Sequence, residues 1–322
     1  MLKQIRHSRE DKLALSANIA ATLAARFGKR IRFNEPMAAH TTLRVGGPAD
    51  ALVMPRSPEE LIDLMRLLHD EGIAWFILGG GTNLLVRDQG IRGVVISLSR
   101  MCRIRRVAEG PESTRVTVEA GARLSALCRY AQENGLSGMS FAVGIPGTVG
   151  GAAMMNAGTV LGDMGTVITD LAVLHPPDRV ETIGRDRLDF TYRELKWDRS
   201  GMPPVILSAA IRLGRTAPDD LRQSTNERTA WRKASQPGGF SAGCVFRNPC
   251  QGPSAGELID RSGLKGYAEG DALISEKHAN FFINRGNATA ADLLRLMGVV
   301  QERVFNTFNT LLEPEIKIVG QA

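Results

Sequence analysis

The sequence predicts a protein of the mixed α and β class, organised around two glycine-rich loops. Apolar residues recur with helical period in some segments, and other segments alternate or form short apolar runs typical of strands. Glycine gathers at two places between these elements. At 322 residues, the chain is long enough for about two domains with a substantial core.

Composition and charge are those of an ordinary globular protein, and the mildly basic charge favours a small anionic ligand or indicates nothing special. Hydrophobic residues make up 43% and charged residues 23%, with a net charge of +6. Lysine and arginine are scattered along the chain, apart from a small cluster at Arg103, Arg105 and Arg106. Aromatic residues amount to only 5%, too few for base-stacking surfaces. We therefore expect no nucleic-acid partner.

The cysteine pattern and the apolar runs predict a cytoplasmic protein. Its cysteines, Cys102, Cys128, Cys244 and Cys250, form no Cys-x-x-Cys pair, so we expect a reducing compartment and no metal site. The charged start of the sequence lacks the features of a signal peptide. No stretch approaches the roughly 18 apolar residues of a membrane span. We expect no membrane insertion, and a monomer.

Periodicity and breaker residues predict the order of the elements. Helices are expected at 9–27, 57–70, 124–134, 255–262 and 289–308. Strands are expected at 49–54, 75–78, 84–86, 93–98, within 104–118, and at 167–174, 179–183, 205–213, 279–283 and 312–319. Residues 40–47 are expected to be extended. The polar segment 218–237, helical at first, is expected to mark the boundary of a second unit.

Two glycine-rich segments are the strongest sign of a ligand. Residues 137–158 hold six glycines among apolar or small residues, and a triple glycine follows the strand expected at 75–78. Such segments suit backbone N–H groups that face a phosphate-bearing ligand. Neither segment is a G-x-G-x-x-G or a Walker loop. A tightly turned core loop without a ligand is the alternative.

Eight segments stand in order along the chain: TTLRVGGPAD (41–50), LGGGTNLLVRD (78–88), GIPGTVGGAAMMNAG (144–158), TYRE (191–194), SAGCVFRNP (241–249), GLKG (263–266), HANFFIN (278–284) and LEPEIKIVG (312–320). Together they resemble the UDP-N-acetylenolpyruvoylglucosamine reductase family over nearly the whole chain. SAGCVFRNP, GLKG and HANFFIN are similar to the shorter branch of the family, which lacks a tyrosine-bearing substrate loop.

The resemblance implies an α+β protein with an FAD-binding fold of the vanillyl-alcohol oxidase type. Two α+β subdomains, 1–98 and 99–222, would hold FAD without a covalent bond, and a C-terminal α+β domain, 223–309, would bind substrate. The strand at 310–322 is expected to return to the second subdomain. NADPH would reduce FAD, and hydride would then pass to UDP-N-acetylglucosamine enolpyruvate, giving UDP-N-acetylmuramate for peptidoglycan.

The same resemblance points to three catalytic residues. Arg193 would hold the carboxylate and the developing enolate, because its guanidinium is a permanent planar donor. Glu315 would polarise the carboxylate as a protonated acid, with Glu313 as the rival two residues away. Cys244 would protonate carbon where the family usually has serine. A thiol pKa of about 8.5 makes donation easy, although a thiolate beside Arg193 could not donate.

Each of these residues also has a plain structural interpretation. Cys244 could be an inert core residue, Arg193 a surface ion pair with Glu194, and Glu315 a side chain facing water. His278 is expected to be a hydrogen-bonded structural histidine without a catalytic role.

The resemblance also implies binding residues. Those expected at FAD are Gly79, Gly80, Gly81, Thr82, Asn83, Gly144, Ile145, Pro146, Gly147, Thr148, Gly150, Gly151 and Asn156. Those expected at the substrate are Tyr192, Arg228, Arg232, Asn248 and Lys265, with Arg87, Arg123 and Lys317 as weaker candidates.

Two other functions stay open at this stage. One is an FAD-dependent oxidase or dehydrogenase of the same fold with another substrate. The other is a flavin-binding or nucleotide-sugar-binding protein without catalysis, with Cys244 as the first lesion.

Overall fold

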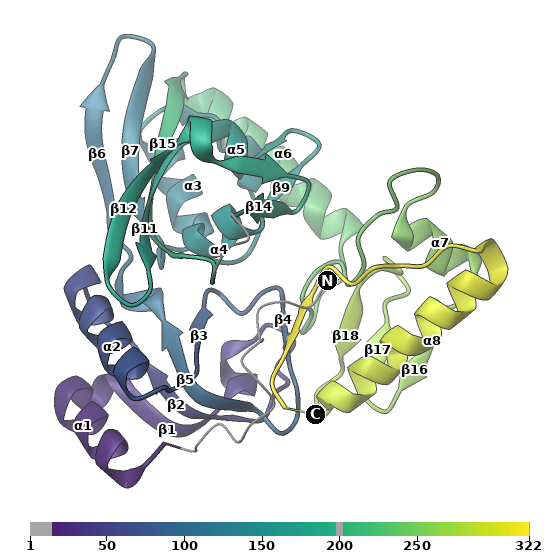
Figure 1. Cartoon of the computed structure of the whole chain (residues 1–322). Helices are drawn as coiled ribbons and strands as arrows, with labels where there is room; N and C mark the ends of the chain where they lie inside the picture. Colours follow the sequence, from purple (N-terminus) through teal and green to yellow (C-terminus); the bar gives the residue numbers. More distant parts are fainter. Residues whose placement is uncertain (1–14, 198–201, 322) are drawn as a thin grey trace. The chain divides into compact units, whose positions relative to one another are not determined.

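The chain folds as two units, each of which gathers segments that are far apart in the sequence. The computed structural model describes residues 15–197 and 202–321. Among these, unit 1 comprises 15–32, 51–80, 93–197 and 202–229, and unit 2 comprises 33–50, 81–92 and 230–321 (Figure 1).

The first sheet has two helices packed against it. Its strands follow the order β1 (Ile31–Pro36), β2 (Pro48–Val53), β5 (Ile91–Ser97) and β3 (Trp75–Leu78), and β3 is parallel to β5. Helices α1 (Ala17–Phe27) and α2 (Pro58–Asp70) bury their apolar residues in the core that includes this sheet (Figure 1). The structure confirms the prediction for 57–70. It confirms the prediction for 9–27 from Ala17 onward, and residues 9–14 lie outside the described residues.

A larger sheet in unit 1 carries the second glycine-rich segment. Its order is β12 (Arg179–Gly184), β11 (Ile168–His175), β15 (Val205–Arg215), β7 (Ser113–Glu119) and β6 (Ile104–Glu109), and β8 (Leu136–Ser137) pairs with β15. Two helices, α3 (Leu124–Glu133) and α4 (Val149–Met154), accompany it. The structure confirms the strands predicted at 167–174 and 179–183, which pair as the hairpin β11–β12, and the helix predicted at 124–134.

The remaining elements of unit 1 are short. They are β9 (Gly158–Thr159), β10 (Gly162–Asp163), α5 (Met164–Val167), β13 (Asp189–Thr191) and β14 (Glu194–Lys196), with single 3₁₀ turns at 28–30, 98–100, 140–142 and 185–187. The hairpins β9–β10 and β13–β14 contain residues of the candidate site described below.

Unit 2 has a small sheet, a long helix and a second apolar core. The sheet is β16 (Ala268–Glu269), β17 (Ala272–Ile274) and β18 (Phe282–Asn284), and the helices are α7 (Ala255–Arg261) and α8 (Ala290–Phe308). A 3₁₀ turn spans Met37–His40. The carboxylate of Asp88 accepts hydrogen bonds from the N–H groups of Ala290 (2.8 Å) and Ala291 (2.9 Å), which lie in the first turn of α8.

The C-terminal strand pairs with a different partner from the one expected. β19 (Lys317–Val319) is parallel to β4 (Leu84–Val86), which lies within 1–98 and not within 99–222. This pairing is favoured because Ile316 and Leu85 are buried in the same core. The expected boundaries at 98/99 and 222/223 stay predictions. Helix α6 (Pro218–Ser235) runs without interruption through the second, and residues 41–47 form a turn and irregular chain instead of an extended run.

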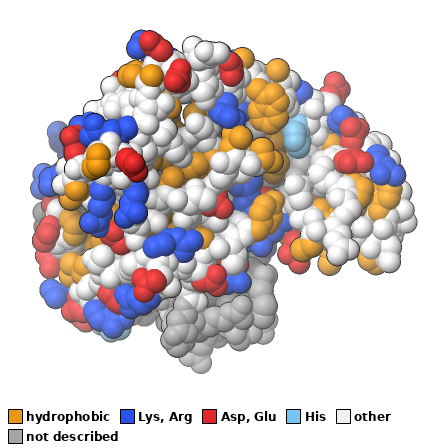
Figure 2. Space-filling model, turned by 90° about the horizontal axis from the view of Figure 1, so that it is seen from above, with side chains coloured by type: hydrophobic (Ala, Val, Ile, Leu, Met, Phe, Trp, Pro, Cys, Tyr) orange, Lys and Arg blue, Asp and Glu red, His pale blue; other side chains and the backbone are white. Residues whose placement is uncertain are grey.

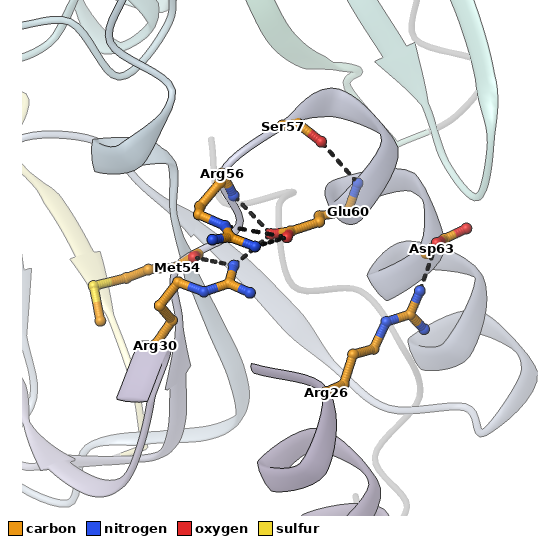
Figure 3. A network of polar contacts seen from close by, with 7 residues as sticks. All are labelled: Arg26, Arg30, Met54, Arg56, Ser57, Glu60 and Asp63. Carbon is orange, nitrogen blue, oxygen red and sulfur yellow. Dashed lines mark hydrogen bonds and ion pairs between the residues drawn. The ribbon is translucent and has the colours of Figure 1, made fainter. Parts of the chain in front are cut away.

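An ionic network joins the start of α2 to the end of α1 in unit 1. Arg30 and Arg56 both contact the carboxylate of Glu60, which also accepts the N–H of Arg56 at 2.9 Å (Figure 3). Burial raises the pKa of Glu60, but the N–H of Arg56 and the guanidinium groups more than offset this and lower it to about 2. Nearby, Arg26 pairs with Asp63 at 2.5 Å.

We predict that Glu60→Gln removes stability near neutral pH. Because the pKa of Glu60 is lowered by folding, its contribution is fully present above its ordinary pKa of 4.5 and is lost as pH falls toward about 2. With 27% of the side chain exposed, the loss should be about 1–2 kcal/mol. Urea unfolding of both proteins between pH 2 and 7 measures it.

The matched control is Asp63→Asn, because Asp63 pairs with Arg26 on the surface and has 47% of its side chain exposed. It should cost less than about 0.5 kcal/mol. Parallel pH curves for the wild type and Glu60→Gln would contradict the prediction.

Candidate active site

In unit 1 the two glycine-rich segments lie against each other, backbone to backbone. A Cβ built on Gly80 would stand 2.7 Å from the Cα of Gly147, and one on Gly79 would stand 3.1 Å from Oγ1 of Thr148. Thr148 is the N-cap of α4, and its hydroxyl accepts the N–H of Gly151 at 3.4 Å. This packing leaves no room for a side chain at Gly80.

The exposed backbone of these segments suits a phosphate-bearing group. Gly79, Gly80, Gly144 and Pro146 are exposed, so the segments are not sealed inside a core as in the alternative interpretation. Neither 79–86 nor 144–158 contains an acidic residue that would repel a diphosphate. Backbone without side chains, exposed and free of acids, fits the approach of an anion to N–H groups.

The end of the triple-glycine loop belongs to unit 2. Gly81 is buried there, and a Cβ on it would lie 1.8 Å from the carbonyl oxygen of His40. Asn83 donates through Nδ2 to the carbonyl of Glu315 at 3.0 Å and accepts the N–H of Lys317 on its own carbonyl at 3.0 Å. Asn83 therefore ties the loop to the C-terminal segment.

Asn156 uses its amide inside unit 1. Its Nδ2 donates to Asp163 (3.1 Å) and to the carbonyl of Thr191 (3.0 Å), and its Oδ1 accepts the N–H of Gly165 at 2.9 Å. The residue is 5% exposed and has φ of +40°, a region that asparagine tolerates. Both amide hydrogens are thus engaged, so any contact of this side chain with FAD would come from its oxygen.

Arg193 occupies the turn between β13 and β14 with a left-handed backbone. Its φ is +59°, which is uncommon for a residue other than glycine. Its Nη1 donates to the carbonyl of Gly158 at 3.0 Å, and its guanidinium lies 5.5 Å from the centre of the Tyr192 ring. Tyr192 is 58% exposed. The same turn is held by Asn156 through Thr191.

Cys244 follows an irregular step in unit 2. Phe240 forms an isolated β-bridge with Asn284, and Cys244 forms one with Phe281. From one bridge to the next, the first segment advances by four residues and the second by three. The extra residue marks a bulge, and Gly243 has φ of +79° with nothing near its missing Cβ. A left-handed conformation, and not crowding, therefore accounts for glycine at this position. Bulges of this kind redirect the next side chain, here a half-buried thiol.

Glu315 lies at a second bulge, where the C-terminal segment pairs with the residues that follow Cys244. The N–H groups of Glu315 (2.7 Å) and Ile316 (3.4 Å) both reach the carbonyl of Val245. Two residues thus oppose one, which breaks simple alternation at Glu315. Glu315 is half-buried, and Glu313 is exposed. In unit 2, Val245 therefore follows Cys244 in the chain and accepts a hydrogen bond from Glu315 on its carbonyl. Arg193 lies in unit 1.

The expected substrate residues have identifiable roles in the fold. Arg228 and Arg232 are four residues apart on α6, a spacing that puts them on one helix face. The Oδ1 of Asn248 accepts the N–H of Ala255 at the start of α7 (3.0 Å). Lys265 forms an ion pair with Asp260 at 2.5 Å.

Arg247 is a residue that the sequence analysis missed. Its N–H donates to the carbonyl of Glu313 at 2.9 Å, while its Nε is buried without a hydrogen-bond partner among the described residues. A buried guanidinium nitrogen without a partner suits an anionic ligand. The signal was available, since Arg247 stands in the segment SAGCVFRNP.

The other titratable candidates are less suited to chemistry. Burial raises the pKa of the Cys128 thiol to about 11, so this thiol stays protonated. Burial, with the nearby charge of Lys265, lowers the pKa of His278, whose Nδ1 accepts the N–H of Asn280 at 3.3 Å.

The described part of the chain offers neither a cluster of metal ligands nor a helix able to span a membrane. No group of three or more His, Cys, Asp and Glu residues between 15 and 321, leaving out 198–201, is arranged to hold a metal ion. No helix in those same ranges has the length and apolar character needed to cross a membrane.

Comparison with known proteins decides the family. The family described as "UDP-N-acetylenolpyruvoylglucosamine reductase, C-terminal domain" matches residues 236–319, and the one described as "FAD binding domain" matches residues 49–183. A UDP-N-acetylenolpyruvoylglucosamine reductase from Desulfosudis oleivorans is 50% identical over 301 residues, which cover 92% of this chain and 96% of that protein. The chain belongs to the UDP-N-acetylenolpyruvoylglucosamine reductase family.

Further relatives agree. A reductase of the same name from Heliobacterium modesticaldum is 41% identical over 289 residues, covering 89% of this chain and 90% of that protein. The crystal structure of UDP-N-acetylenolpyruvylglucosamine reductase from Thermus caldophilus matches with a TM-score of 0.74 and 35% identity, over 88% of this chain and 97% of the other. The expected α+β fold with an FAD-binding domain is confirmed.

As a member of this family, the protein is an FAD-dependent oxidoreductase of peptidoglycan precursor synthesis. It reduces UDP-N-acetylglucosamine enolpyruvate to UDP-N-acetylmuramate and uses FAD and NADPH.

We predict that Gly80→Ala lowers FAD content. The new Cβ would meet backbone of Gly147 that cannot move aside, so the two loops should separate at a cost of about 1–3 kcal/mol. The ratio of flavin absorbance to protein absorbance and the thermal midpoint measure both effects.

Gly298→Ala is the control, because Gly298 lies within α8 with open space around its Cβ position. It should stabilise the protein by about 0.5–1 kcal/mol and leave FAD content unchanged. Full flavin loading of Gly80→Ala would count against a role for this loop contact.

Proposed function

We propose that Arg193, Cys244 and Glu315 carry the acid–base part of this reduction. The supporting observation is in unit 2, where the N–H of Glu315 donates to the carbonyl of Val245, the residue after Cys244. Two bulges place these residues in irregular backbone of the kind that redirects side chains.

The reaction needs fixed positive charge at the substrate carboxylate. When bound, FAD would carry hydride from NADPH to the enolpyruvyl double bond. Negative charge then develops on the neighbouring carbon and its carboxylate, and a preorganised donor lowers that barrier. Arg193 suits this role because its guanidinium stays charged and is oriented by its bond to the carbonyl of Gly158.

Cys244 would supply the proton that completes the reduction. Hydride and a proton together saturate the double bond, and the S–H bond of Cys244 breaks as the new C–H bond forms. Glu315, in its protonated form, would donate a hydrogen bond to the carboxylate and stabilise its developing charge. A thiol at this position gives up a proton more readily than an alcohol would.

Binding would be divided between backbone and arginine side chains. The exposed backbone around Gly80 and Gly144 would face the FAD diphosphate. Arg228 and Arg232 would face the diphosphate of the nucleotide sugar, and the buried Nε of Arg247 makes it a further candidate.

The other substrate candidates keep narrower proposed roles. Asn248 would use its Nδ2, since its oxygen caps α7. Lys265 would have to exchange its pair with Asp260 for a ligand. Tyr192 offers an exposed ring beside Arg193.

We also propose that the enzyme is a cytoplasmic monomer that acts on small molecules without nucleic acid. All four cysteines are free. On the face shown in Figure 2, Lys and Arg side chains are interspersed with Asp and Glu instead of forming one basic tract.

Two alternatives are weaker. An oxidase or dehydrogenase with another substrate is disfavoured, because the match at 236–319 covers the part of the chain expected to bind the enolpyruvyl sugar. A non-catalytic binding protein would show a flavin spectrum without turnover. Bleaching by NADPH followed by recolouring with the enolpyruvyl sugar distinguishes all three.

We predict that Cys244→Ala separates the two half-reactions. NADPH should bleach the flavin at the wild-type rate, and recolouring by the enolpyruvyl sugar should slow by about 10²–10⁴-fold because no proton donor remains. Stopped-flow absorbance measures both steps.

Cys244→Ser is the matched variant, since it restores a protic side chain of similar size. It should recover most of the recolouring rate. Wild-type recolouring in Cys244→Ala would remove Cys244 from the mechanism.

We predict that Glu315→Gln slows recolouring, while Glu313→Gln does not. Glu315 is half-buried beside Val245, and Glu313 is exposed, so only the first is placed to act on substrate. The expected losses are about 10²-fold and less than about twofold, respectively. The reverse order would move the catalytic role to Glu313.

A further inference from the structure

We propose that Asn280 is a positioning residue for the reaction, one that holds the segment carrying Cys244 and supporting Glu315. The inference rests on the proposed roles of those two residues. Asn280 lies in the loop between β17 and β18 in unit 2, and we propose no part for it in the chemical step itself.

The side-chain amide of Asn280 forms a clamp: it hydrogen-bonds both the N–H and the carbonyl of one residue, Phe246. Its Oδ1 accepts the N–H of Phe246 at 2.9 Å, and its Nδ2 donates to the carbonyl of Phe246 at 2.8 Å. The backbone carbonyl of Asn280 also accepts the N–H of Val245 at 2.9 Å. One residue thus makes three hydrogen bonds to the two residues that follow Cys244.

The side-chain amide of Asn280 takes the place of a β-strand beside Phe246. On the other edge, the N–H of Arg247 reaches the carbonyl of Glu313, and the N–H of Glu315 reaches the carbonyl of Val245. These bonds flank Phe246, so its own N–H and carbonyl point away from the C-terminal segment. The loop holding Asn280 is turning there, and its side-chain amide supplies the donor and acceptor that a strand would have supplied.

The clamp is strong because it is buried and has no alternative partner in water. Asn280 is 2% exposed and Phe246 is 0% exposed. Loss of either bond would leave a buried backbone group unsatisfied. The loop itself is closed by Ser275, whose N–H donates to the carbonyl of Phe281 at 2.9 Å and whose hydroxyl accepts two further N–H groups.

The segment 245–246 connects the two proposed catalytic residues. Cys244 precedes it, and the bulge at Glu315 is formed on the carbonyl of Val245. A shift of this peptide would therefore move the thiol and the carboxyl group together. Reactions of this kind are sensitive to displacements of about 1 Å, which can cost on the order of 10²-fold in rate.

The chain offers a matched control in Asn284. It is also 2% exposed, and its amide also spans two backbone segments: Nδ2 donates to the carbonyl of Leu43 (2.9 Å), and Oδ1 accepts the N–H groups of Gly286 (2.7 Å) and Ala288 (3.0 Å). Its backbone N–H donates to the carbonyl of Phe240 at 2.9 Å, a bond that a side-chain change leaves in place, and its side chain bonds neither Val245 nor Phe246 in the hydrogen bonds described above. Loss of either amide should therefore have a similar effect on stability.

The experiment compares Asn280→Asp with Asn284→Asp in the full FAD-loaded enzyme. Each change keeps the acceptor and removes the donor. We expect both to lower the thermal midpoint, but only Asn280→Asp to slow recolouring by the enolpyruvyl sugar, by on the order of tenfold or more, with bleaching by NADPH within about twofold. Asn280→Ser, a smaller change, is used if Asn280→Asp does not fold.

A second readout needs no turnover. Iodoacetamide labels the thiols, and mass spectrometry gives the rate at Cys244 relative to the exposed Cys102 and Cys250 across pH 6–9. Asn280→Asp should change the relative rate at Cys244 by about threefold or more, whereas Asn284→Asp should leave it unchanged.

The outcomes separate the two proposals. If both aspartate variants slow recolouring equally, or neither does, and the labelling of Cys244 is unchanged, Asn280 has only a structural role. If Cys244→Ala recolours normally, the proposed donor is wrong, and the labelling experiment still decides whether Asn280 positions the thiol.

Discussion

Buried asparagine amides hold the irregular segments on which the proposed chemistry depends. Asn280 is 2% exposed in unit 2, and Asn156 is 5% exposed in unit 1. Each bonds backbone groups in irregular chain or at a strand end, with a side chain that offers the same donor and acceptor as a peptide. Because an unsatisfied buried peptide group is expensive, these amides allow the chain to leave regular structure without loss of stability.

Irregular backbone of this kind is found at each proposed catalytic position. Arg193 has a left-handed backbone, Cys244 follows a bulge at Gly243, and Glu315 shares the carbonyl of Val245 with its neighbour. Regular strands would fix their side chains by alternation alone. Bulges and left-handed turns instead direct individual side chains, at a conformational cost that the surrounding hydrogen bonds offset.

Local environment separates the thiols of this chain into different chemical classes. Burial raises the pKa of Cys128 to about 11, which makes it an inert packing group. Cys244 is half-buried and precedes the two residues that Asn280 holds, and it is the thiol that we propose as the proton donor. A proton donor in this role depends on a fixed position, and the hydrogen bonds of Asn280 hold the backbone that follows Cys244.

Much of the fold follows from the sequence, because local patterns determine local structure. The helices at 57–70, 124–134 and 289–308 and the paired strands at 167–174 and 179–183 were predicted from apolar period, capping residues and turn residues. The glycine-rich segments and the family motifs were equally visible. The partner of the C-terminal strand, the strand at 31–36 and the role of Asn280 were not, because they depend on contacts between residues far apart in the sequence. The sequence by itself determined most of the helices and strands and, through its motifs, the chemistry of the family. Only the tertiary structure decided which backbone groups meet, since hydrogen bonds between distant segments leave no periodic signal in either one.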